Sequence, residues 1–185
     1  MLLSLFPFSN RSLSRERFMV GYDTGVRELR WEVVGRGYES KLANLLHDVI
    51  RGKDGGLIVR IDALPDFEES VDVKYRLSQA LVHAEDVLVS FFNPRYGPSD
   101  FVAFLKERRY VINDDIGGFG SLHGLKNQLL ETLSGNEVLL GEIVKIVDDM
   151  VALCKSALKV IDSYLEIAKT QKVTQEGVDK VVGGR

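Results

Sequence analysis

The sequence contains a single cysteine, Cys154, among its 185 residues. One cysteine cannot form a disulfide within the chain, so a secreted fold held together by disulfides is excluded. A reducing, cytoplasmic compartment is indicated instead. Cys154 falls on the apolar face of an expected helix, where a free cysteine ordinarily acts as a small buried hydrophobic residue.

Long apolar runs and a strong excess of one charge are also missing. No run approaches the roughly 18 residues that a membrane span requires, so no membrane partner is expected. The net charge is −3, which is too small to draw the whole surface towards nucleic acid or anionic lipid. Any site for a polyanion must therefore be a local patch.

Signatures of catalysis are absent as well. The three histidines, His47, His83 and His123, fall on three different expected helices without the spacing of metal ligands. No serine or cysteine lies in a nucleophile motif. The glycine-rich segment 117–121 lacks the lysine of a phosphate-binding loop, and two aspartates precede it. The sequence predicts no catalytic residue, metal or cofactor, and a protein that is not an enzyme; an enzyme that uses residues 117–120 remains the third alternative.

The pattern of residues 17–133 predicts a small α/β domain of the α+β class. Helices are expected where apolar residues recur every three or four positions: residues 40–50, 69–92, a short helix from Ser99, and 121–133. About four short strands are expected at 18–22, 26–33, 57–61 and 110–112, with the first two forming a hairpin. Residues 1–16 are expected to be a flexible arm, and residues 171–185 a flexible tail.

A long helix is predicted over residues 134–170, and it carries the clearest pattern in the chain. Two apolar seams with 4-3 spacing run through residues 139–168, which is typical of a coiled coil with partners on both sides. We expect one seam to contact the domain and the other a second subunit, giving a dimer or tetramer. The residues expected to hold subunits together are Ile143, Val147, Met150, Cys154, Ala157, Ile161 and Tyr164. The alternative is that both seams pack within one chain, against the helices at 69–92 and 121–133.

Basic residues are interleaved with aromatic ones in two parts of the domain. This combination is typical of proteins that bind single-stranded nucleic acid, because cations contact phosphates while flat rings stack on unpaired bases. The expected binding residues are Arg27, Arg30, Trp31, Arg36, Tyr38, Arg60, Arg95, Tyr96, Lys106, Arg108, Arg109 and Tyr110. The alternative is a solvated surface of ion pairs, since Glu28, Glu32 and Glu107 lie among them.

An α/β domain with such aromatic and basic residues, followed by one long assembly helix, resembles the ThermoDBP group of archaeal single-stranded-DNA-binding proteins. The resemblance spans residues 17–170 and lies in the architecture. It implies an oligomeric, non-catalytic protein that binds single-stranded DNA without sequence preference, which is our leading hypothesis. A composition rich in arginine, valine and glycine fits a thermophile. The alternative function is a helical interaction or scaffold protein without a role in nucleic-acid binding.

Overall fold

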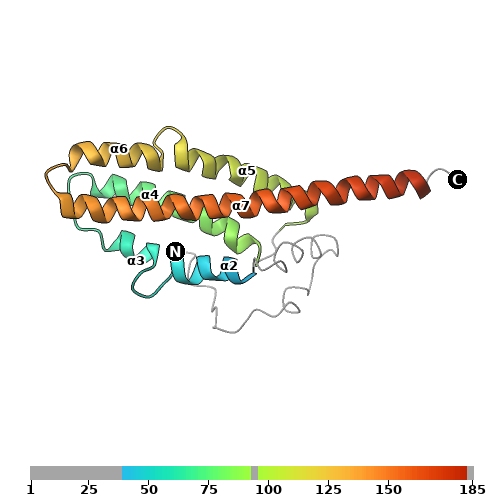
Figure 1. Cartoon of the computed structure of the whole chain (residues 1–185), viewed down its shortest axis with the longest axis horizontal. Helices are drawn as coiled ribbons and strands as arrows, with labels where there is room; N and C mark the ends of the chain where they lie inside the picture. Colours follow the sequence, from blue (N-terminus) through green and yellow to red (C-terminus); the bar gives the residue numbers. More distant parts are fainter. Residues whose placement is uncertain (1–38, 93–95, 183–185) are drawn as a thin grey trace.

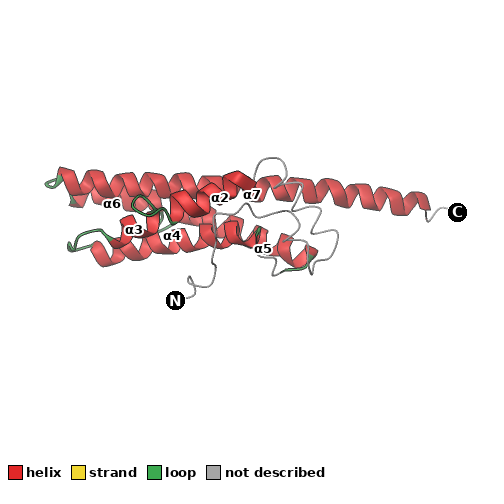
Figure 2. Ribbon diagram, turned by 90° about the horizontal axis from the view of Figure 1, so that it is seen from below, coloured by secondary structure: helices red, strands yellow, loops and turns green. Residues whose placement is uncertain are grey.

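The computed structural model describes residues 39–92 and 96–182, and every regular element within them is helical (Figures 1 and 2). The elements are α2 (Glu39–Asn44), the π-helix η3 (Leu45–Ile50), α3 (Leu57–Asp62), α4 (Ser70–Ser90), α5 (Pro98–Gly117), α6 (Leu122–Thr132) and α7 (Glu137–Val182). The α+β prediction is therefore wrong for this part of the chain, which is all-α. The expected strands 18–22 and 26–33 and the arm 1–16 lie outside the described residues.

The helices in the described residues form four columns whose directions alternate along the chain (Figure 1). The first column consists of α2, η3 and α3 in succession; the second is α4; the third is α5 followed by α6; the fourth is α7. The two unbroken helices, α4 and α7, pack against each other, and both contact the two broken columns. This is an up-down-up-down bundle in which the apolar stripes of the helices meet along one core.

Residues 57–61 were expected to form a buried strand but form helix α3. Leu57 and Ile61 are buried, at i and i+4, whereas Val59 is 42% exposed. A strand would place residues 57, 59 and 61 on the same face. Residues 57–61 are almost all apolar, so the sequence could not distinguish the period of a strand from that of a helix. The observed burial follows the helical period.

The strand expected at residues 110–112 is also wrong, because these residues continue helix α5. Pro98 occupies the first turn of α5, a favourable position for proline. Phe101, Leu105 and Ile112 are fully buried, while Tyr110 is 75% exposed, which again fits helical spacing. Helix α5 ends at Gly117, and the connection to α6 begins at Gly118.

Three aromatic rings join α4, α5 and α7 towards the end of the bundle from which α7 projects. The ring of Tyr164 lies edge-on to Phe101, with centroids 4.9 Å apart, and to Phe91 at 5.7 Å. Phe91 and Phe101 are 5.5 Å apart in the same edge-to-face arrangement. Such pairs stabilise a core by about 0.5–1.5 kcal/mol each beyond the burial of their area. They fix α7 against α5.

Helix α7 extends well beyond the other described helices (Figure 1). It begins after Asn136, whose side-chain oxygen accepts a hydrogen bond from the backbone nitrogen of Leu139 at 3.3 Å, as an N-cap residue does. The helix ends at Val182, so it includes residues 171–182, which were expected to form part of a flexible tail.

Candidate functional site

A groove of about 630 Å³ lies between the first half of α5 and the last part of α7 before it leaves the bundle. Its floor is apolar, formed by the half-buried side chains of Val102, Leu165 and Ala168. Its remaining lining is charged and consists of Lys106, Arg109, Asp162, Glu166 and Lys169. The volume is within the range of sites that bind small ligands or inserted side chains.

The spacing of residues on both helices creates this groove. On α5, Val102, Lys106 and Arg109 occupy positions i, i+4 and i+7 and so share one face. On α7, Asp162, Leu165, Glu166 and Lys169 occupy positions i, i+3, i+4 and i+7. Two such stripes facing each other leave a channel with an apolar base and charged rims.

The two walls of the groove are joined by an ion pair. Nε of Arg109 donates a hydrogen bond to Oδ1 of Asp162 at 2.7 Å, and their side chains are 50% and 53% exposed. An exposed pair of this kind contributes about 0–1 kcal/mol to stability. It orders the two side chains without preventing either one from contacting a bound molecule.

Among the residues predicted to bind nucleic acid, those that the structure describes do not converge on one surface. Arg108 reaches Asp86 on α4 at 3.2 Å and lies over the ring of Phe104, whereas its neighbour Arg109 is bonded to α7. Consecutive helical residues point about 100° apart, so the two arginines face different columns. Tyr110 is exposed, and Tyr96 stacks on Phe104 with ring centroids 4.8 Å apart.

Arg60 lies in a separate part of the bundle. Its Nη1 donates to Oδ2 of Asp149 at 2.7 Å, and Asp149 precedes Asp162 by about 20 Å along α7 at 1.5 Å per residue. Of the other predicted residues, Lys106 lies in the groove described above. The remaining ones lie outside the described residues: Arg27, Arg30, Trp31, Arg36, Tyr38 and Arg95.

The residues predicted to join subunits lie in the core of the single chain. All seven have no exposed surface: Ile143, Val147, Met150, Cys154, Ala157, Ile161 and Tyr164. Helices α3, α4, α5 and α6 of the same chain contact α7. The two apolar seams are therefore covered largely within one chain, as in the alternative stated for them, and these seven side chains offer no surface to a second subunit.

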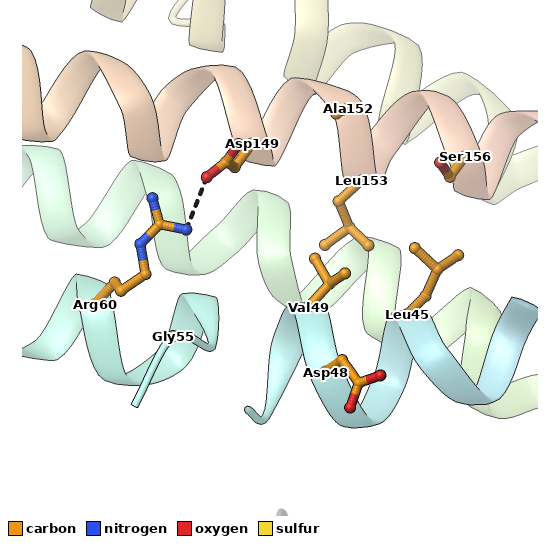
Figure 3. A pocket seen from close by; sticks show the side chains of 9 residues that line it. All are labelled: Leu45, Asp48, Val49, Gly55, Arg60, Asp149, Ala152, Leu153 and Ser156. Atoms are coloured by element: carbon orange, nitrogen blue, oxygen red, sulfur yellow. Dashed lines mark hydrogen bonds and ion pairs between the residues drawn. The ribbon is translucent and has the colours of Figure 1, made fainter. Parts of the chain in front are cut away.

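A smaller hollow of about 380 Å³ lies between η3, α3 and α7 (Figure 3). Leu45, Val49 and Leu153 point into it, and the ion pair of Arg60 with Asp149 closes one end. Its polar groups comprise one paired cation, two aspartates and Ser156.

The described contacts of the glycine-rich segment 117–121 are structural. Arg76 of α4 donates to the backbone oxygens of Gly120 at 3.1 Å and Ser121 at 3.0 Å. Ser121 begins α6, since its Oγ accepts from the nitrogen of Gly124. Gly120 has a φ of +74°, a conformation that glycine adopts readily. The loop thus joins α5 to α6, with its carbonyls held by a cation.

The histidines and acidic residues do not form a metal site in the described part of the chain, where no group of three potential ligands comes together. His83 is instead paired with Asp115 of α5, Nδ1 to Oδ2 at 2.7 Å. Burial raises the pKa of the Cys154 thiol from 9.0 to about 12, and the negative charge of Asp115 adds to this effect. The thiol is therefore protonated and is a poor nucleophile at neutral pH.

The groove residues on α7 were only partly identified from the sequence. The span of the two apolar seams, residues 139–168, includes Leu165 and Ala168, but the sequence did not single out these residues as a binding surface. The feature that could have identified the groove is the position of residues 162–169 near the end of the seams, because the neighbouring helices of the chain end there. That feature becomes visible only when the lengths of the columns are known.

Comparison with models of known protein families, with curated proteins and with solved structures gives no match. The described helices include none that is both long and apolar enough to cross a membrane. The resemblance to the ThermoDBP group relied on an α/β domain, and residues 39–92 and 96–182 contain no strand. It stays an untested prediction.

Proposed function

We propose that this chain is a non-catalytic helical interaction protein whose groove between α5 and α7 receives an amphipathic helix. The observation that carries the proposal is the combination of an apolar floor, charged rims and a helix wall that continues past the bundle (Figure 1). Grooves of this form bind helices that present apolar residues at i, i+3, i+4 and i+7.

The charges of the groove favour a peptide over a small molecule. Three cations and two carboxylates line it, so a helix with both signs flanking its apolar stripe can pair with each rim. The floor is short, because Val102, Leu165 and Ala168 are its apolar residues in the part of the chain that the structure describes. We therefore expect recognition through one or two apolar anchor residues surrounded by ion pairs, and binding that weakens as salt rises.

A labelled helical peptide tests this function. Its sequence should place leucines at i, i+3, i+4 and i+7 between glutamates and lysines, and a scrambled peptide of the same composition is the control. We expect saturable binding of the first peptide alone, measured by fluorescence anisotropy. Leu165→Glu in the groove should weaken it at least about tenfold, while Val138→Glu, on an exposed part of the same helix, should not. Equal binding of both peptides would contradict the proposal.

One observation supports a second candidate function, the binding of single-stranded nucleic acid. Lys106, Arg109 and the ring of Tyr110 are all exposed within little more than one turn of α5. A ring that is 75% exposed is able to stack on an unpaired base. The attraction of this face for the phosphates of a nucleic acid is reduced, because Arg109 already contacts Asp162 and Arg108 contacts Asp86.

This candidate is tested with a labelled oligonucleotide at two salt concentrations. Tyr110→Ala should weaken binding by about 1–3 kcal/mol per stacked base, and Tyr75→Ala, which removes an exposed ring from α4, should have no effect. Lys106→Gln should reduce the dependence of binding on salt. An affinity unchanged by Tyr110→Ala and Lys106→Gln would rule out this face of α5 as the binding surface.

A further inference from the structure

We infer that the helix received by the groove is α7 of a second copy of this chain, running antiparallel to the first and centred on Leu165. The inference rests on the proposed function and adds the identity of the partner. It places self-association on the groove rather than on the seven core residues predicted from the sequence.

The order of charges on α7 indicates the antiparallel direction. Asp162 and Lys169 carry opposite charges, lie seven residues apart on one face, and flank Leu165. A second copy in the reverse direction brings each Asp162 towards the Lys169 of the other copy. A parallel copy would instead bring like charges together, which is unfavourable. The stripe is thus complementary to itself only when reversed.

The groove also has the chemistry required for a two-fold contact. In such a contact the same surface is used by both copies, so each charge needs a partner of opposite sign within that surface. Lys106 on α5 is an exposed cation on one wall, and Glu166 on α7 is an exposed anion on the other. Val102, Leu165 and Ala168 of both copies would then form one enclosed apolar centre.

The length of α7 supports this arrangement over a short contact at one point. From Leu165 to the end of α7 at Val182 there are 17 further helical residues, which span about 26 Å at 1.5 Å per residue. In a reversed second copy this part of α7 runs back along α5, whose 20 residues span about 30 Å. Each projecting helix end would therefore be covered by the other copy.

The mass of the intact chain in solution, measured by sedimentation equilibrium over a wide micromolar range, tests the inference. We expect a dimer. Leu165→Glu should raise the dissociation constant at least about tenfold while the far-ultraviolet circular dichroism of the helices is retained. Val138→Glu, on the same helix outside the groove, is the matched control and should remain dimeric. A monomeric wild-type chain, or a dimer unaffected by Leu165→Glu, would overturn the inference.

Charge reversal tests the direction of the two helices without relying on a core substitution. Asp162→Lys and Lys169→Glu should each weaken the dimer, and the double variant should recover most of the affinity, because each copy again faces the opposite charge. Both residues are exposed, so folding should be retained. If the double variant dimerises more weakly than either single variant, the antiparallel pairing is excluded.

The two levels of the proposal can fail separately. A chain that is monomeric but binds the amphipathic test peptide in its groove retains the proposed function and disproves the second copy as its partner. A chain that is monomeric and does not bind the peptide disproves both. A dimer lost on Leu165→Glu supports both.

Discussion

Glu85 of α4 is buried and accepts hydrogen bonds from two nitrogens of Arg51, from Nε at 3.1 Å and from Nη2 at 2.5 Å. Arg51 lies directly after the π-helix η3, so the pair holds the first column of the bundle to α4. The side chain of Glu85 is 6% exposed and that of Arg51 is 28% exposed. A buried carboxylate is tolerated because its charge is compensated here.

Substitution of Arg51 by methionine should destabilise the protein because it leaves the Glu85 carboxylate without this cation. Breaking a buried ion pair costs about 3–5 kcal/mol, and the partial exposure of Arg51 places the expected loss near the lower end, at about 3 kcal/mol. Chemical denaturation followed by circular dichroism measures it. The double variant Arg51→Met with Glu85→Leu should regain stability relative to the single variant; a double variant as unstable as Arg51→Met would show that the charge is not the cause.

The helices α4, α6 and α7 were predictable because their apolar residues follow a long, regular helical period. The two wrongly predicted strands in the described residues are short apolar segments. Residues 57–61 and 110–112 are rich in β-branched residues and too short for one period to dominate, so tertiary packing decided their structure. The burial of Ile61 and Ile112 beside exposed Val59 and Tyr110 depends on which helices surround them, and this information is not local.

The candidate site was less predictable because its chemistry depends on distant partners. Arg60 is bonded to Asp149, 89 positions away, and Arg109 to Asp162, 53 positions away. A list of cations along the sequence cannot show that these two arginines face carboxylates. The apolar seams of α7 posed the same difficulty: their periodicity predicted partners on two sides, but could not distinguish columns of the same chain from a second chain.

The backbone at Gly56 should not accept a side chain. A Cβ at this position would lie 2.4 Å from the nitrogen and 2.6 Å from the oxygen of Gly52, and backbone atoms cannot move aside cheaply. The conflict lies between two turns of chain that are joined by a hydrogen bond from Gly56 to Gly52 at 3.0 Å. We expect Gly56→Ala to lower the free energy of unfolding by about 2 kcal/mol, in the range of overpacked sites.

The adjacent glycine provides the control for this experiment. A Cβ at Gly55 would meet no atom within 4 Å, so Gly55→Ala should be neutral, or stabilising by about 0.4–1 kcal/mol because it restricts the unfolded chain. Thermal unfolding of both variants measures the difference. Equal stability of the two variants would show that the close approach of the chain at Gly56 is not a packing constraint.

Arg76 should determine the stability of the connection between α5 and α6. Its guanidinium donates to Gly120 and Ser121 as described, and also to the side-chain oxygen of Gln128 on α6 at 3.2 Å. We expect Arg76→Met to cost about 2 kcal/mol, since hydrogen bonds to charged groups contribute about 1.5–3 kcal/mol. Hydrogen exchange at residues 118–121 should accelerate, whereas Lys74→Met on the same helix should leave it unchanged. Unchanged exchange in the Arg76 variant would show that the loop is held by other contacts.

The Cys154 thiol should be inert in the folded protein and reactive after unfolding. It has no exposed surface, and its pKa of about 12 keeps it protonated at neutral pH, so neither access nor thiolate formation favours reaction. A chromogenic disulfide reagent should react with one thiol per chain only in denaturant. For comparison, a chain carrying Ala152→Cys with Cys154→Ala presents an exposed thiol on the same helix and should react without denaturant.

The same pKa shift predicts a loss of stability in alkali. The folded state holds the thiol proton up to a pKa of about 12, whereas the unfolded state releases it near 9.0. Below pH 9.0 both states are protonated and the thiol contributes no dependence on pH; between these values the unfolded state alone ionises. Stability should then fall by about 1.4 kcal/mol per pH unit from this group. The difference in unfolding free energy between the wild type and Cys154→Ala, measured against pH, isolates this contribution from the lysines and tyrosines. A difference that stays constant from pH 8 to 11 would show that the thiol ionises equally in both states.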